Sequence, residues 1–318
     1  MTQGADARMT LAGDLAPVYQ PRLQPQVRRL VLRGLSCQVR QWGAAEASVM
    51  VLLHGARDVS ASFQFVVDAL RGAWCVVAPD WRGHGGSDWT PGSYWQAELM
   101  ADLDALLDVV APDRAVVLVG HSMGGNVASL YAGMAPHRVT RLVMLDALGD
   151  LLHRLPVKVD EILRLVLQTR HTPAAGAGYA GLADLADRLR RHNPRLAAGR
   201  AHYLAGAMAR ALPDGRFAWA RDPNFRRSLP SLHTVEDWGV VWRAITAPVL
   251  AIRSADPRPN APTSDPAEAA RREAFFRDLT RITLAETGHN LHHDAPEAVA
   301  HAIEAFAAAP HDAPRLPR

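Results

Sequence analysis

One short turn constrains this chain more than any other feature. Residues 120–124 read Gly-His-Ser-Met-Gly, and they separate an apolar strand pattern at 115–119 from an apolar helix pattern that starts at Asn126. A β-branched, wholly apolar run is typical of a strand that is buried on both faces. The two glycines allow the strand to turn sharply into the helix, which holds the Ser122 hydroxyl clear of the backbone. The turn therefore predicts an α/β architecture with an accessible serine at a strand end.

The rest of the chain alternates strand and helix patterns around this turn. Strand patterns lie at 27–32, 35–40, 49–53, 75–78, 115–119, 142–145, 249–252 and 282–284. Helix patterns lie at 62–70, 94–110, 125–134, 266–279 and 296–307. We expect the first two strands to form an antiparallel hairpin and the later strands to pair in parallel through right-handed crossovers. The sequence thus predicts a mostly parallel central sheet flanked by helices.

The alternation stops after the sixth strand. The following stretch has helical patterns at 157–168, 182–191, 195–211 and 235–244, broken by a Gly/Ala-rich piece at 172–178. An insertion at this place in an open α/β sheet lies over the carboxyl ends of the strands, where ligands bind. We therefore expect an N-terminal arm at 1–26, an α/β core at 27–146 and 236–309, a helical cap at 147–235, and a C-terminal tail at 310–318.

Composition narrows the class of protein. The chain is 48% hydrophobic and 21% charged, which is typical of a globular protein, and it has no run of about 18 apolar residues that would predict a membrane span. Its first 26 residues lack the apolar segment of a secretory signal. With a net charge of +3 and no dense basic stripe, nucleic-acid binding is not expected. Cys37 and Cys75 give no disulfide framework. We expect a cytoplasmic enzyme, and a homo-oligomer is possible.

Three further segments follow strand patterns in an order that resembles a known family. They are His54-Gly55-Ala56-Arg57, the loop Asp80-Trp81-Arg82-Gly83-His84-Gly85-Gly86-Ser87, and Gly288-His289-Asn290. Together with the serine turn, these segments resemble the α/β-hydrolase superfamily over residues 27–309. The stretches at 123–128, 214–217 and 288–294 look like its serine hydrolase-like branch. The resemblance implies the α/β-hydrolase fold.

The resemblance also implies a Ser-His-acid triad. Ser122 is then the nucleophile, and His289 is the general base that later protonates the leaving group. Two residues are candidates for the acid. Asp256 follows a strand by a short loop, which is the usual position in the family, although Arg253 stands where the family has glycine. Asp146 ends a strand, at a position that some branches use instead. We favour Asp256 and keep Asp146 as the alternative acid.

The chemistry follows from the choice of nucleophile. By resemblance, the backbone N–H groups of Ala56 and Met123 form the oxyanion hole. A serine nucleophile suggests acyl transfer to water through an acyl-enzyme, with a small-molecule acyl substrate and no cofactor. We expect a hydrolase of small or medium carboxylic esters. Hydrolysis of a C–C or amide bond by the same triad is an alternative, and so is a non-catalytic ligand-binding protein.

A metal site is a further possibility that the sequence raises. His289, His292 and His293 stand at a spacing that could bind a metal ion. Zinc, however, needs a defined third or fourth ligand, and no cysteine or carboxylate cluster accompanies these histidines. We therefore expect no metal.

Overall fold

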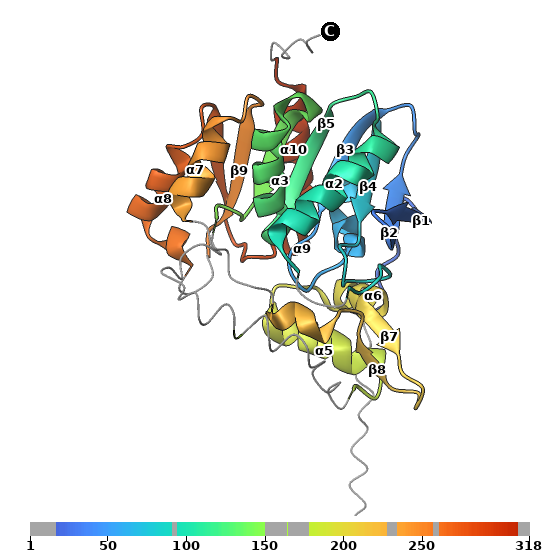
Figure 1. The fold of residues 1–318 in the computed structure, drawn as a ribbon. Coiled ribbons are helices and arrows are strands. Elements are labelled where there is room, and N and C mark those ends of the chain that lie inside the picture. Colours follow the sequence, from blue (N-terminus) through green and yellow to red (C-terminus); the bar gives the residue numbers. More distant parts are fainter. Residues whose placement is uncertain are drawn as a thin grey trace, which may run out of the picture.

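A single eight-stranded sheet organises the protein in the computed structural model, which describes residues 17–90, 94–149, 164, 178–227, 234–256 and 261–310 (Figure 1). The strands are β1 (Gln26–Leu32), β2 (Leu35–Trp42), β3 (Ser48–Leu53), β4 (Trp74–Pro79), β5 (Val116–His121), β6 (Val139–Leu145), β9 (Val249–Ser254) and β10 (Leu279–Leu284). Their spatial order is β1-β2-β4-β3-β5-β6-β9-β10. The β1–β2 hairpin is antiparallel, β2 is antiparallel to β4, and all later pairs are parallel. The expected mostly parallel sheet is confirmed.

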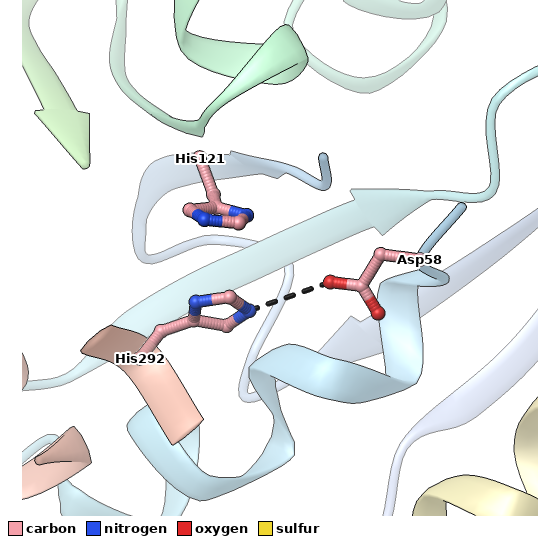
Figure 2. Close-up of side chains that lie close together, drawn as sticks. All are labelled: Asp58, His121 and His292. Atoms are coloured by element: carbon pink, nitrogen blue, oxygen red, sulfur yellow. Dashed lines mark hydrogen bonds and ion pairs between the residues drawn. The ribbon is translucent and has the colours of Figure 1, made fainter. Parts of the chain in front are cut away.

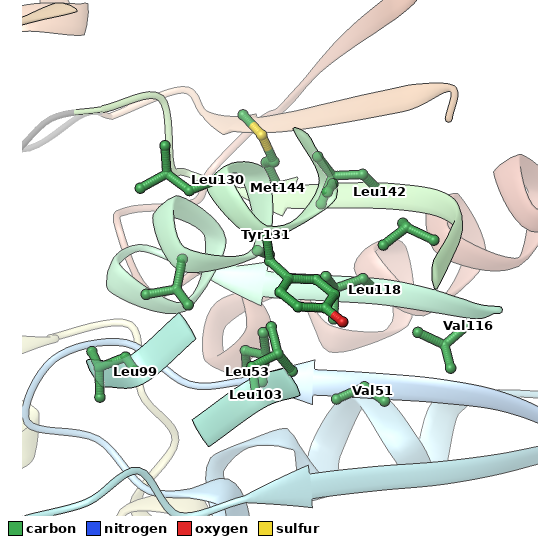
Figure 3. Packing of buried hydrophobic residues seen from close by; sticks show 14 of the residues in the cluster. Val51, Leu53, Leu99, Leu103, Val116, Leu118, Leu130, Tyr131, Leu142 and Met144 are labelled. Atoms are coloured by element: carbon green, nitrogen blue, oxygen red, sulfur yellow. The ribbon is translucent and has the colours of Figure 1, made fainter. Parts of the chain in front are cut away.

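Helices cover both faces of this sheet. One face carries α2 (Gln96–Val110), α3 (Met123–Met134) and α7 (Val235–Arg243), and the other carries α1 (Gln64–Ala69) and α10 (Pro296–Ala308). Figure 3 shows Tyr131 of α3 and Leu103 of α2 in the same buried cluster as Leu118 of β5. In the described part of the chain, no helix is both long and apolar enough to cross a membrane. Because helices bury both of its faces, the sheet supports the loops at its strand ends.

Two shorter helices complete the C-terminal part of the core. They are α8 (Pro266–Glu273) and α9 (Leu291–Asp294). The helix expected at 266–279 ends at Glu273, because the chain must extend before it enters β10 at Leu279. This difference leaves the order of elements as expected.

Residues 182–219, between β6 and α7, form a separate layer. It contains α5 (Leu182–His192), α6 (Ala198–Met208), β7 (Ala209–Ala211) and β8 (Phe217–Trp219). Leu185 and Leu204 of this layer are buried in one cluster with Phe65 of α1, so the layer packs on the core. Figure 1 shows it beside one end of the sheet. That a cap begins and ends at 147 and 235 stays a prediction.

The β7–β8 hairpin was not expected from the sequence. The sequence predicts a helix at 195–211, but α6 begins only at Ala198 and ends at Met208, and β7 follows directly. A tight turn at 212–216 then reverses the chain, and Gly215 adopts a φ of 80° that favours glycine. The hairpin follows from this turn, which the helical periodicity concealed. The helix expected at 157–168 and the Gly/Ala-rich piece at 172–178 lie almost entirely outside the described residues.

The described end of the N-terminal arm lies between the two layers. Tyr19 donates its hydroxyl to Asp68 of α1 at 2.7 Å, and its backbone N–H bonds to the carbonyl of Gly199 in α6 at 3.1 Å. The Arg200 guanidinium lies 5.9 Å from the centre of the Tyr19 ring. Residues near 19 thus join α1 to α6.

Close packing of α3 on β3 makes Gly124 hard to replace. A Cβ at Gly124 would lie 2.1 Å from the Leu53 carbonyl oxygen, and that oxygen belongs to a strand paired on both sides. We expect Gly124→Ala to lower the free energy of unfolding by about 3 kcal/mol or more, because backbone and not a side chain must move. Urea unfolding followed by circular dichroism measures this change.

Gly206 provides the matched control. It lies in α6, it is exposed, and a Cβ there would meet no atom within 4 Å. Gly206→Ala is expected to raise the free energy of unfolding by up to about 1 kcal/mol, since alanine favours the helix more than glycine does. Equal effects of the two substitutions would contradict the steric argument at Gly124.

Candidate active site

The serine turn (residues 120–124) presents Ser122 at the junction of β5 and α3. Ser122 has φ 50° and ψ −114°, in the left-handed region that side chains rarely adopt. Its N–H bonds to the Leu145 carbonyl at 3.0 Å, which anchors the strained residue on β6. A Cβ at Gly120 would lie 2.4 Å from the Gly125 nitrogen, so the turn closes this tightly only with glycine there. The hydroxyl is therefore held at the strand end, half-exposed.

His289 lies in the base loop (residues 285–290), which connects β10 to α9. Its Nε2 is 3.0 Å from Ser122 Oγ, and its Nδ1 is 2.6 Å from Asp146 Oδ2. An ionised carboxylate only accepts hydrogen bonds, so Nδ1 carries the proton and Nε2 is free to accept the serine hydroxyl. The three side chains form one continuous hydrogen-bonded chain, in the arrangement by which a base activates a serine.

Asp146 is held as an ionised, buried carboxylate. It follows β6 directly, and its side chain is 7% exposed. Burial raises its pKa, but the His289 hydrogen bond and charge and the Ser254 N–H outweigh burial and bring the pKa of Asp146 below its usual value. Ser254 donates to Oδ1 from its backbone N at 3.3 Å and from its hydroxyl at 3.1 Å. Sequence reasoning missed Ser254.

The preference for Asp256 as the partner of the histidine is corrected by these contacts. The Asp256 side chain is 67% exposed and pairs with Arg195 at 2.9 Å. It lies two residues beyond the end of β9, whereas Ser254, the last residue of that strand, contacts Asp146. β9 lies next to β6 in the sheet. Asp146, just after β6, therefore contacts His289, and Ser254, at the end of β9, hydrogen-bonds to Asp146. The arginine at 253 in place of the glycine typical of the family was the signal of this departure.

The turn at residues 54–58, called the oxyanion turn after the role that the sequence predicts for it, lies directly against the serine turn. A Cβ at Gly55 would be 2.7 Å from Nδ1 of His121 and 3.3 Å from the Ser122 Cβ, so no larger residue fits there. Among the residues that the structure describes, no acceptor takes the backbone N–H of Ala56 or of Met123, the first residue of α3. Both donors remain available for a developing negative charge.

One group of side chains in the described ranges has donors of the kind that bind metals, and it differs from the His289-His292-His293 set that the sequence raised as a possibility. Asp58, His121 and His292 are all buried, and one donor atom from each lies within 4.8 Å of the others (Figure 2). The two rings are 4.3 Å apart between centroids, closer than the roughly 5 Å that tetrahedral Zn–N geometry gives two coordinating imidazoles. Both Asp58 oxygens also accept hydrogen bonds from neighbouring residues. The arrangement favours a hydrogen-bonded cluster over a metal site.

Acid is expected to destabilise the protein through its buried histidines. Burial, with the charge of a neighbouring histidine, lowers the pKa of His84 and of His293 from 6.5 to about 3. At a pH between these two pKa values, the histidines bind protons in the unfolded chain but not in the folded chain. The free energy of unfolding is therefore unaffected above pH 6.5 and falls as the pH drops toward 3, by up to about 1.4 kcal/mol per pH unit for each histidine.

Urea unfolding at several pH values between about 7.5 and 5 tests this expectation. His84→Asn removes one of the two groups, so the free energy of unfolding of the variant should depend less steeply on pH. A slope as steep as that of the wild-type protein would contradict the assignment.

Comparison with known proteins identifies the class that this fold and site define. Residues 50–302 match the model of the alpha/beta hydrolase family. The match covers most of the chain, and the chain therefore belongs to this family.

Individual relatives agree with the family. A serine hydrolase-like protein of Danio rerio is 35% identical over 112 residues, which are 35% of this chain and 34% of that protein, in agreement with the branch that the motifs resemble. The matched part thus spans about a third of that relative. The esterase Rv0045c of Mycobacterium tuberculosis is 25% identical over 279 residues, 86% of this chain and 87% of that esterase.

A solved structure shows the same fold. The thioesterase domain from the curacin biosynthetic pathway superposes with a TM-score of 0.80 at 24% identity, covering 89% of this chain and 99% of that domain. At this identity the likeness shows the architecture alone.

Proposed function

We propose that the protein is a serine hydrolase that cleaves a small or medium carboxylic ester through an acyl-enzyme. The observation that carries the proposal is the chain of hydrogen bonds from Ser122 through His289 to Asp146. A buried carboxylate, an oriented imidazole and a strained serine at a helix N-terminus are the parts that acyl transfer requires. Asp146 takes the role of the acid in this proposal.

The reaction follows from the geometry of these groups. His289 Nε2 removes the proton of Ser122 as its oxygen attacks the ester carbonyl, and the N–H groups of Ala56 and Met123 stabilise the oxyanion that forms. The imidazolium then protonates the departing alcohol. Water, activated by the same imidazole, attacks the acyl-enzyme and releases the acid. Asp146 stays ionised throughout and stabilises the imidazolium.

Relatives support an ester as the substrate. The esterase Rv0045c matches this chain over most of both lengths. A second candidate arises from the 2-hydroxy-6-oxo-2,4-heptadienoate hydrolase of Pseudomonas putida, which is 34% identical over 129 residues, 39% of this chain. A substrate of that kind would use the same serine, histidine and aspartate, so only substrate tests separate the two candidates.

Fluorophosphonate labelling with mapping by mass spectrometry tests the proposal. Stoichiometric modification of Ser122 is expected, together with turnover of nitrophenyl esters whose chain-length profile bounds the acyl pocket. Ser129 is the internal control and should take no label. It is buried in α3, where its hydroxyl donates to the Asn126 carbonyl and accepts a hydrogen bond from Trp242. Folded protein that takes no label and turns over no ester would overturn the proposal and favour a ligand-binding role instead.

A further inference from the structure

Three buried side chains join the parts of the candidate active site. Asp58 ends the oxyanion turn, His121 is the last residue of β5, and His292 lies on α9 beyond the base loop (Figure 2). They are 8%, 2% and 0% exposed. Segments that lie far apart in the sequence therefore meet at one cluster under the serine turn.

His121 connects directly to the backbone of the base. Its Nε2 is 2.8 Å from the carbonyl oxygen of His289, and a carbonyl only accepts, so Nε2 carries the proton. Burial, with the charges of His292 and His289, brings the pKa of His121 well below its usual value, and the ring stays neutral with this single N–H. The His121 ring also contacts both other rings, with centroids 4.8 Å from His289 and 4.3 Å from His292.

Asp58 fixes the other side of the cluster. Its Oδ1 accepts the Val59 N–H at 2.9 Å and its Oδ2 accepts the Ser62 hydroxyl at 2.8 Å, which hold the carboxylate in place beside the oxyanion turn. His292 Nε2 lies 3.4 Å from the same Oδ2. The Asp58–His292 contact thus connects the oxyanion turn to α9, and α9 follows the base loop.

We propose that His121 is a positioning residue for His289. Its Nε2–H donates to the His289 carbonyl. The His292 ring, which contacts Asp58, packs against the His121 ring and limits its movement. The oxyanion turn, the serine turn and the base loop are in this way held in one arrangement. A displacement of about 1 Å between reacting groups can cost about 100-fold in rate, so the cluster acts on the chemical step. The inference rests on the proposed function of Ser122 and His289.

Two substitutions of His121 separate positioning from general stability. His121→Leu removes the donor at similar volume, whereas the amide nitrogen of His121→Gln can occupy the place of Nε2. We expect His121→Leu to lower kcat by about tenfold or more, with KM changed by less than about threefold, and His121→Gln to recover most of kcat. An equal loss of kcat in the two variants, or a change in KM with no change in kcat, would overturn the proposal.

His293→Gln is the matched control. His293 is buried like His121 and its ring lies 4.0 Å from that of His292, but it makes no contact with the His289 carbonyl. The kcat of the His293→Gln variant is expected to remain within about twofold of the wild-type value, because no reacting group moves. A loss of kcat equal to that of His121→Leu would mean that any buried histidine has this effect and would overturn the assignment.

A spectroscopic measurement tests the inference without turnover. The His289 Nδ1 proton, shared with Asp146 over 2.6 Å, should give a far-downfield NMR resonance. We expect this resonance to shift or broaden in His121→Leu and to persist in His121→Gln and His293→Gln. An unchanged resonance in His121→Leu overturns the inference. If the wild-type protein hydrolyses no ester, the proposed function fails, and the resonance alone decides the role of His121.

Asp58→Asn keeps the test decisive should His121→Leu fail to fold. The amide has the shape of the carboxylate, but it lacks the charge that faces His292. We expect a severalfold lower kcat at unchanged KM and a perturbed His289 resonance. An Asp58→Asn variant with wild-type kcat and resonance would show that the cluster does not position the base.

Discussion

Asp146→Asn is expected to lower kcat by a factor on the order of 10⁴, the loss found when the acid of a Ser-His-Asp triad is made neutral. The amide that this substitution introduces could donate to His289 Nδ1 where the carboxylate accepts, which would favour the tautomer with the proton on Nε2. That tautomer cannot remove a proton from Ser122. The imidazolium would also lose the charge that stabilises it 2.6 Å away. Steady-state kinetics on a nitrophenyl ester measures the loss.

Asp256→Asn is the control for this prediction. The Asp256 side chain is largely exposed and its partner is Arg195, so the substitution breaks a surface ion pair of small energetic value. Its kcat should stay within about threefold of the wild-type value. Should Asp256→Asn prove the more damaging of the two, the role proposed for Asp146 would be wrong.

Ser122→Ala is expected to have a still larger effect, a loss of kcat of about a million-fold, as found for serine hydrolases that lose the nucleophile. Without Oγ no acyl-enzyme can form, although the oxyanion donors remain. The variant should also take no fluorophosphonate label. Its far-ultraviolet circular dichroism should match that of the wild-type protein, because removal of one hydroxyl leaves the serine turn its backbone contacts.

Residues that act as one unit give non-additive losses. Ser122→Ala combined with His289→Ala should cost no more than Ser122→Ala alone, because the base has no function without its nucleophile. Additive losses would mean that His289 acts on the reaction independently of Ser122. Substantial remaining turnover in Ser122→Ala would place the nucleophile elsewhere, and substantial remaining turnover in His289→Ala would place the base elsewhere.

The sequence predicted most of the sheet because its signals are local. An apolar β-branched run such as 115–119 identifies a buried strand without reference to any neighbour. The β7–β8 hairpin escaped prediction because its strands have three residues each, too short for a periodicity, and because β7 follows α6 without a break. Their pairing depends on the turn that Gly215 closes.

The candidate site divides in the same way. The sequence predicted Ser122 and His289, which lie in contact, since the turn chemistry around each is encoded in adjacent glycines. It did not predict which carboxylate contacts His289, because Asp146 and Asp256 each follow a strand and look equivalent in a linear chain. Only the side-by-side packing of β6 and β9 decides which carboxylate reaches the imidazole.

The sequence by itself determined the order of strands and helices in the core, the serine turn and the histidine that follows the last strand. The tertiary structure decided which acid faces that histidine, that Ser254 supports the acid, and that Asp58, His121 and His292 meet beneath the serine turn. The physical reason is range. Backbone preferences act over a few residues, whereas a contact such as that of Asp58 with His292 spans 234 positions and forms only when the sheet brings distant loops together.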